Sequence, residues 1–381
     1  MYGFTLSDEQ RAFVEAIRDL ARRECGTREQ RDALTKHNTE PHNPAMYKQV
    51  AELGWLGVSI PTEFGGSGGG LVDLCLFLEE ISRGQVPIGG FSVSAISAGP
   101  YERFGTEEQK QEILTGIVGG AVEAIAMSEP EAGSDVGNLR CKAERRNGGY
   151  VINGQKTWIS EAQHAEHILL VCRTETGSDK HKGLTMLSVP AGSDGVEIRG
   201  IETMGGKVVN DVFFEDCEVP ADSLVGVEGQ AWMQLMSGLN TERLIIAAQS
   251  TGLAQRALDD LLSYTKEREQ FGRPIGSFQA LSHRIADLAT EVACTRLMTY
   301  AVARQCDENP GVLFPQEASM AKLKATETGK KVALEGMQMM GGYGYATEYD
   351  MQNHVRMNLV STIYGGTSEI QREIIAKTHG L

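Results

Sequence analysis

Residues 121–225 contain seven short runs in which apolar and polar side chains alternate, and this stretch constrains the fold more than any other part of the sequence. Turn pairs such as Asn147-Gly148, Asn153-Gly154 and Asp194-Gly195 separate the runs. Short strands at this spacing predict a compact antiparallel β-domain, either a sandwich or a barrel. No helical pattern alternates with them, so a doubly wound parallel sheet is not expected. The predicted strands are 124–128, 140–145, 150–159, 167–173, 184–190, 196–201 and 211–214.

Helical periodicity occupies the sequence on both sides of this stretch. Ser7 can cap a first helix, and apolar spacing predicts further helices at 46–53, 71–81, 241–268, 279–307, 316–340 and 368–377. The long segments after residue 225, with their short connections, are typical of an antiparallel four-helix bundle. We therefore expect a multi-domain α+β protein. Its domains would be an N-terminal helical domain (1–120), a middle β-domain (121–225) and a C-terminal helical bundle (226–381).

Composition narrows the classes of partner. A chain of 381 residues exceeds what one hydrophobic core usually serves. Its formal charge of −15 argues against nucleic acid, although a few local arginines can still hold an anionic cofactor. The seven cysteines show no metal-like spacing, which suits reduced, mostly buried thiols. With no secretory signal and no apolar run long enough for a membrane span, we expect a cytoplasmic protein without a metal site.

Three segments carry more specific information. The loop from Met127 to Asp135 offers backbone N–H groups and small hydroxyls to a flat ligand, but it can equally be a polar loop capped by Ser134. In the hairpin 153–160, Trp158 can belong to the core or stack against a ring system. At the end of a long helix, Arg268 can complement the helix dipole or clamp a phosphate.

In this order, these segments resemble the acyl-CoA dehydrogenase family over nearly the whole chain. Further matching motifs are 54–57, 61–66, 104–109, 211–214, 218–220, 341–344 and 363–371. The resemblance implies a helical–β–helical subunit, usually in a homotetramer, that binds FAD. It also implies an enzyme that desaturates an acyl-CoA thioester to the trans-2-enoyl-CoA and passes electrons to electron-transferring flavoprotein.

The resemblance assigns roles to individual residues around the flavin ring. Met127 and Ser128 match residues at the isoalloxazine edge. Trp158 and Ser160 match residues that pack against the flavin and hydrogen-bond to it, with serine at 160 where the family usually has threonine. Ser134 matches a residue near both the cofactor and the thioester.

A second set of residues matches contacts to the rest of the cofactor. Arg268, Gln270 and Phe271 match the stretch that reaches a neighbouring subunit's FAD, with Arg268 at the pyrophosphate. Gln338 and Gly342 match residues beside the adenosine portion. Thr367 and Glu369 match a region near FAD just after the C-terminal catalytic motif.

The catalytic base requires a choice between two positions. Many family members carry it between Tyr364 and Gly366, where this chain has Gly365. The isovaleryl-CoA and long-chain branches place it where Glu242 stands, although a first-turn glutamate can also be a solvated partner of the helix dipole. Because the first position is vacant, we expect Glu242 to be the only base. The Gly365 backbone N–H would still polarise the thioester carbonyl, and Arg243 would either orient Glu242 or brace the bundle.

The substrate is constrained by two observations. An aromatic ring at Tyr364 argues against an isovaleryl substrate, because isovaleryl-type enzymes have a small residue there. Residues 84–102 contain no arginine for a distal carboxylate. We expect a medium-to-long or terpenoid-like acyl chain, bound beside Ser134, Arg243 and Tyr364. The alternatives are an acyl-CoA-oxidase-like enzyme, a carrier-protein-linked acyl dehydrogenase, or a non-catalytic flavin- or acyl-CoA-binding subunit.

Overall fold

The computed structural model describes residues 5–175 and 181–381, which form two compact units. The helical unit consists of the chain up to Leu34, Gly70–Val86 and Asn240–Leu381, and the sheet unit of Thr35–Gly69 and Pro87–Leu239. Helices, strands and helices follow one another along the chain, which confirms the predicted helical–β–helical fold class. The domain boundaries at residues 120 and 225 stay predictions, because the compact units do not follow chain order.

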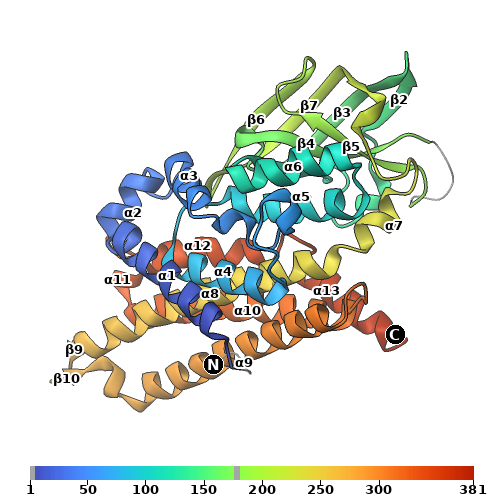
Figure 1. Cartoon of the computed structure of the whole chain (residues 1–381). Coiled ribbons are helices and arrows are strands. Elements are labelled where there is room, and N and C mark those ends of the chain that lie inside the picture. Colours follow the sequence, from blue (N-terminus) through green and yellow to red (C-terminus); the bar gives the residue numbers. More distant parts are fainter. Residues whose placement is uncertain (1–4, 176–180) are drawn as a thin grey trace. The chain divides into compact units, whose positions relative to one another are not determined.

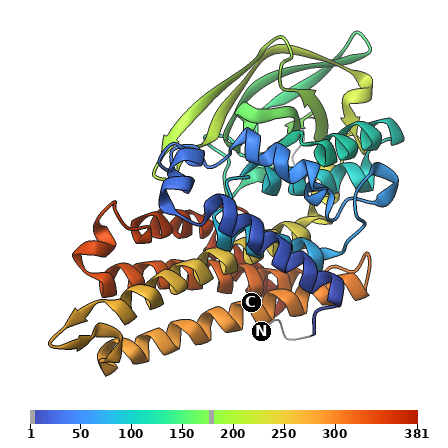
Figure 2. The same ribbon diagram turned by 60° about the vertical axis from the view of Figure 1, so that its left-hand side comes forward.

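The helical unit is built mainly of long helices that run side by side (Figures 1 and 2). Ser7 caps the first of them, accepting a hydrogen bond from Gln10 N at 3.1 Å, as expected. A short hairpin of β9 (Glu269–Gln270) and β10 (Arg273–Pro274) joins α8 to α9. The helices are α1 (Asp8–Cys25), α4 (Leu71–Gly84), α8 (Leu239–Glu267), α9 (Gln279–Glu308), α10 (Pro315–Met340), α11 (Gly342–Tyr345), α12 (Met351–Ser361) and α13 (Ser368–Thr378). The helix α2 (Arg28–Thr35) ends at the boundary of this unit.

The core of the helical unit lies between α8, α9 and α10. Leu258, Leu288 and Val332 are buried there together, and α12 and α13 pack along α10. Met339 and Met340 also belong to this core.

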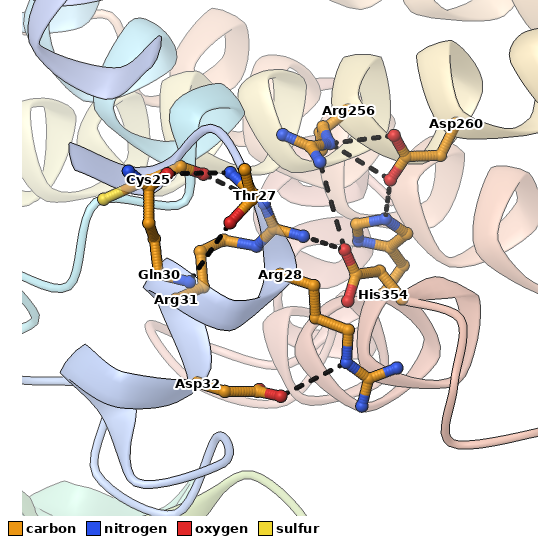
Figure 3. Close-up of polar contacts among 10 residues, drawn as sticks. Cys25, Thr27, Arg28, Gln30, Arg31, Asp32, Arg256, Asp260 and His354 are labelled. Carbon is orange, nitrogen blue, oxygen red and sulfur yellow. Dashed lines mark hydrogen bonds and ion pairs between the residues drawn. The ribbon is translucent and has the colours of Figure 1, made fainter. Parts of the chain in front are cut away.

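A buried polar network ties the start of the chain to its last quarter (Figure 3). Arg31 in α2 forms an ion pair with Asp350 and donates to the carbonyl of Cys25 at 2.9 Å. Arg256 contacts both Asp350 and Asp260, and Asp260 also binds Nε2 of the fully buried His354 at 2.7 Å. These contacts fix α2 against α8 and α12. Removing one member would be costly, because it would leave charged partners in the interior without compensation.

The sheet unit contains one eight-stranded sheet with the order β6-β7-β3-β2-β4-β5-β8, and β1 pairs with β4. Its strands are β1 (Val122–Ala126), β2 (Lys142–Arg146), β3 (Gly149–Ser160), β4 (Ala165–Arg173), β5 (Leu184–Pro190), β6 (Val196–Thr203), β7 (Gly206–Pro220) and β8 (Leu224–Val225). The prediction of wholly antiparallel pairing is wrong where β4 pairs with β1 and with β2, since both pairings are parallel. The chain between β1 and β4 includes the β2–β3 hairpin, which is long enough for the crossover that parallel strands need.

The strand β4 is buried on both faces, and its side chains alternate between two cores. Ile168, Leu170 and Cys172 pack into a cluster enclosed by the sheet. Leu169 and Val171 pack against α5 (Gly90–Phe104) and α6 (Glu107–Gly119), which cover the other face (Figure 1). This period-two division follows from the pleat of the strand. The remaining helices of the unit are α3 (Pro44–Glu52) and α7 (Ala231–Met236).

Five of the seven cysteines are buried and all seven are free thiols, but Cys294 is exposed and Cys306 partly exposed. In the part of the chain that the structure describes, no helix has the length and apolarity needed to cross a bilayer. Over the same residues, no three His, Cys, Asp or Glu side chains group in a way that could hold a metal ion.

Candidate active site

Glu242 and Gly365, the two positions considered for the catalytic carboxylate, lie next to each other in the helical unit. Glu242 is in the first turn of α8, and Gly365 is in the loop between α12 and α13. A Cβ atom on Gly365 would lie 3.5 Å from Oε1 of Glu242. A carboxylate carried at either position can therefore reach the same region.

The space beside Gly365 is occupied by Ile246, which lies one turn after Glu242. A Cβ atom on Gly365 would come within 2.1 Å of Ile246 Cδ1, far closer than any real contact. Gly365 also has a φ of +61°, in the left-handed region that disfavours side chains. In this chain a side chain at position 365 would strain the backbone and would require Ile246 to move.

Burial and two positive charges have opposite effects on the pKa of the Glu242 carboxylate. Burial raises its pKa, while Arg243 and then Lys322 lower it. Arg243 is buried, and burial lowers its pKa while Glu242 raises it. In Lys322, a fully buried residue of α10, burial lowers the pKa to about 8, and Glu242 is the largest opposing influence. Glu242 is thus a desolvated carboxylate with cationic neighbours, which suits a base.

Backbone carbonyls at Ser361, Gly365 and Gly366 accept hydrogen bonds from two side chains. Lys322 Nζ donates to Ser361 O at 3.0 Å and to Gly366 O at 2.9 Å. Gln371 Nε2 donates to Gly365 O at 3.1 Å and to Gly366 O at 3.0 Å. The N–H of Gly365, in contrast, finds no acceptor among the described residues. It is available to a carbonyl oxygen of a ligand.

The neighbours of Gly365 in the loop take different positions. The side chain of Tyr364 is 40% exposed, and Thr367 caps α13 by accepting from Ile370 N at 3.3 Å. Glu369 is exposed in the first turn of α13, where it pairs with Arg372 at 3.6 Å. The roles of Thr367 and Glu369 in binding FAD stay predictions.

A pocket of about 930 Å³ lies between the C-terminal ends of α8 and α10, the β9–β10 hairpin and α11. Four of the residues predicted to bind the cofactor line it: Arg268, Gln270, Phe271 and Gly342. Gln338, in the last turn of α10, does not line it, and its carbonyl accepts from Gly341 N at 3.2 Å. The structure thus gathers most of the second set of predicted residues around one cavity.

The chemistry of this pocket fits the adenosine and pyrophosphate end of FAD. The guanidinium of the exposed Arg268 lies 5.4 Å from the ring centroid of Tyr343 and forms no ion pair with any described carboxylate, so it can hold a phosphate. Phe271, 94% exposed, packs edge-on against Phe278 and offers an apolar surface to a ring. The volume lies within the range of cofactor sites.

The first set of predicted residues lies in the sheet unit, where Met127 and Ser128 follow β1. Ser128 O accepts from Thr157 N at 2.9 Å, which fixes this loop beside the Trp158 segment of β3. Lys156, fully buried, forms an ion pair with Glu129 at 2.8 Å and donates to Met127 O at 2.9 Å. The loop is therefore held rigidly where it leaves β1.

Trp158 is not part of the core, since its side chain is 59% exposed. Its φ of +63° coincides with a register shift between Lys156 and Ile159, and this bulge turns the indole outward. Ser160, at the end of β3, pairs with Val209. Ser134 is exposed, and its hydroxyl bonds to none of the described residues, so it does not act as a cap. An exposed indole beside a fixed loop suits a stacking surface.

Several residues of these sites were not found from the sequence. Lys322, Gln371 and Ile246 act on the Gly365 loop, and the Lys156–Glu129 pair acts on the Met127 loop. One signal was available for Lys322, because it interrupts a face of small residues formed by Ala318, Ala321 and Ala325. A lysine at such a position needs specific partners, because an unpaired buried ammonium is costly.

Family models described as the N-terminal, middle and C-terminal domains of acyl-CoA dehydrogenase match residues 7–121, 124–217 and 229–379. The chain belongs to the acyl-CoA dehydrogenase family, which confirms the predicted family, enzyme class and cofactor.

Individual relatives agree with this assignment. Mitochondrial isovaleryl-CoA dehydrogenase from Solanum tuberosum is 36% identical over 381 residues, covering 97% of this chain and 90% of that protein. The crystal structure of an acyl-CoA dehydrogenase from Geobacillus kaustophilus has a TM-score of 0.92 and 32% identity, with all of both chains covered. A structure described as the FAD complex of PigA has a TM-score of 0.91 and 28% identity, with 99% of each chain covered.

Proposed function

We propose that this protein introduces the α,β double bond of an acyl-CoA thioester and that Glu242 is the base that removes the α-proton. The observation that carries this proposal is the 3.5 Å between Oε1 of Glu242 and the position of a Cβ atom on Gly365. Since the residue at 365 supplies the base in many relatives, Glu242 stands where it can replace it. FAD, when bound, accepts the hydride that leaves the β-carbon.

The environment of Glu242 suits proton abstraction from carbon. Burial makes the carboxylate more basic, while Arg243 and Lys322 favour its ionised form. A proton on Cα becomes acidic enough only when the thioester carbonyl is polarised. We infer that the free N–H of Gly365 donates to that carbonyl, in keeping with its lack of an acceptor among the described residues.

Replacing Glu242 by glutamine tests this assignment. The Glu242→Gln protein should fold and bind FAD, but anaerobic flavin reduction by acyl-CoA should slow by roughly 10²–10⁴-fold or more, as expected when a general base is lost. The matched control is Glu317→Gln, which removes a first-turn glutamate from α10. A Glu242→Gln protein that reduces its flavin at close to the wild-type rate would falsify the role of Glu242.

For the substrate, we propose a medium-to-long or terpenoid-like acyl chain. The aromatic ring of Tyr364 supports this choice over a short branched chain, because the ring fills space that a branch would need. An anaerobic titration with linear and branched acyl-CoAs, followed by flavin bleaching, tests it. Fast bleaching by isovaleryl-CoA alone would contradict the proposal.

The acceptor and the assembly are proposed on the family resemblance. We infer that electron-transferring flavoprotein, rather than oxygen, reoxidises the enzyme, and that the protein is a homotetramer in which Arg268 reaches a neighbouring subunit's FAD. We also assign the flavin ring contacts to Met127, Ser128, Ser134, Trp158 and Ser160. Rapid reoxidation of the reduced enzyme in air would indicate an oxidase instead.

A further inference from the structure

Lys322 is a fully buried lysine whose two hydrogen bonds both go to the Gly365 loop. It lies on the face of α10 formed by Ala318, Ala321 and Ala325, all of which are buried. Its acceptors, Ser361 O and Gly366 O, lie at the two ends of the segment that contains Tyr364 and Gly365. One ammonium group thus holds both ends of this segment.

The charges that face Lys322 single out Glu242. Burial lowers the pKa of Lys322 to about 8. Glu242, Glu327 and Glu369, in that order, act to raise this pKa, and Arg243 acts to lower it. Glu327 is engaged by Ser368 Oγ at 2.7 Å, and Glu369 is exposed beside Arg372. Lys322 forms no ion pair with any carboxylate of the described chain, and among the carboxylates Glu242 has the largest influence on its pKa.

We propose that Lys322 is a positioning residue for dehydrogenation. Its hydrogen bonds hold the backbone from Ser361 to Gly366 so that the Gly365 N–H stays beside Glu242, and its positive charge keeps Glu242 ionised. This inference rests on the proposed role of Glu242 as the base. It assigns two separable contributions, one geometric and one electrostatic, to a fully buried side chain that acts through the backbone and through Glu242.

Different substitutions of Lys322 can separate the geometric from the electrostatic contribution. A neutral side chain of similar length, as in Lys322→Met, removes both the hydrogen bonds and the charge. Lys322→Gln keeps an N–H donor but not the charge. Lys324→Gln is the matched control, because Lys324 is partly exposed on the same helix and pairs with Glu291.

The pH dependence of flavin reduction tests the electrostatic part. With the rate of anaerobic reduction by acyl-CoA measured from pH 5 to 9, the wild-type rate should rise as Glu242 ionises. Without the positive charge, ionisation of Glu242 requires a higher pH. The midpoint should therefore move upward by roughly one pH unit in both Lys322 variants, and stay in place in Lys324→Gln.

Hydrogen exchange tests the geometric part without relying on activity. The amides of the segment 361–371 should exchange faster in Lys322→Met than in Lys322→Gln, and at the wild-type rate in Lys324→Gln. A Lys322→Gln protein that binds FAD and reduces it with the wild-type midpoint overturns the proposal, as does unchanged exchange in Lys322→Met. If wild-type protein is not reduced by any acyl-CoA, the proposed function itself fails, which is a separate result.

Discussion

The backbone of Gly365 is left-handed, and Ile246 occupies the space that a side chain at this position would need. A single atom, Cδ1 of Ile246, is responsible for the closest approach. The cost of a larger residue at 365 therefore has two parts. One comes from the φ of +61°, and the other comes from the contact with Ile246.

Gly365→Ala should lower the free energy of unfolding by about 2–5 kcal/mol, since left-handed strain costs roughly 1–2 kcal/mol and overpacking roughly 1–3. Adding Ile246→Val removes Cδ1 and should recover the part due to overpacking. Gly311→Ala is the control for strain alone, because Gly311 has a φ of +82° and no atom near its Cβ position. Urea unfolding measures the loss of stability in Gly365→Ala, in the double variant with Ile246→Val and in Gly311→Ala. Equal losses in Gly365→Ala and Gly311→Ala would show that Ile246 does not matter.

The sequence identified Glu242 and Gly365 as alternative positions, and the structure places them next to each other. It did not identify Ile246 or Lys322. Those contacts depend on how the loop after α12 meets α8 and α10, and no local pattern records a meeting between segments so distant in the chain. The sequence also left Trp158 open between core and surface, because the bulge that turns it outward changes the facing of every side chain after it.

At the level of elements, a buried acidic turn follows β3. Glu161 has a φ of +56° and is buried, with no hydrogen-bond partner for Oε1. A Cβ atom on Gly89 would lie 2.5 Å from that oxygen, so a larger residue there would require the Glu161 carboxyl group to shift. His42 and His164 lie close by, with ring centroids 4.7 Å apart, and burial lowers the pKa of His42 to about 4.

Glu161→Gln should change how stability depends on pH. Burial raises the pKa of Glu161 from 4.5 to about 8. Between these values the folded protein holds a proton that the unfolded chain releases, so the wild-type free energy of unfolding falls as pH rises from about 4.5 to 8. Glutamine mimics the protonated acid and removes this loss. The variant should match wild type near pH 4 and exceed it by roughly 3–5 kcal/mol at pH 9.

Chemical unfolding at pH 4, 7 and 9 measures this effect. Glu218→Gln, on an exposed position of β7, controls for the loss of one carboxylate. A constant difference between Glu161→Gln and wild type across this range would mean that the pKa of Glu161 is the same in the folded and the unfolded protein.

The long helices with clear periodicity were predicted well, and α5 and α6 were not. The helix α6 begins with a capping box of Thr106 and Gln109, which is a helix start signal present in the sequence. The helix α5 holds glycines, serines and Pro100, a composition typical of turns, and is helical because the sheet unit buries one of its faces. Parallel pairing of β1 could not be predicted, because register between distant strands is a property of the whole sheet.

At the level of the molecule, the chain folds back so that its first helices join its last. Ion pairs of Arg18 with Glu80 and of Arg296 with Glu79 connect α1, α4 and α9 within the helical unit. The predicted division into three consecutive sections describes the order of secondary structure, whereas the packing follows contacts across hundreds of residues. Sequence patterns indicate the order of secondary structure, but they do not indicate how distant segments pack together.

If Arg268 reaches the FAD of a neighbouring subunit, the binding of FAD depends on protein concentration. Diluting the holoenzyme should release FAD if the pocket around Arg268 receives a neighbour's cofactor. Arg268→Met should weaken FAD binding by roughly 10- to 100-fold, as expected for loss of a charged hydrogen bond. Arg273→Met is the control, since Arg273 lies over Phe278 in the same hairpin and does not line the pocket. Flavin fluorescence on dilution measures the release of FAD, and sedimentation measures the state of assembly at the same concentrations. Concentration-independent release would argue against a shared site.

The network around Arg31 has a consequence for how this protein is made. Arg31 leaves the ribosome long before Asp350 exists, and at about 5–20 residues per second the wait is on the order of tens of seconds. During that interval the sheet unit, which ends at Leu239, can complete its own contacts, while α1 and α2 have no partner from the C-terminal helices. Nascent chains of this protein should therefore expose an amphipathic N-terminal segment to chaperones until translation is almost finished.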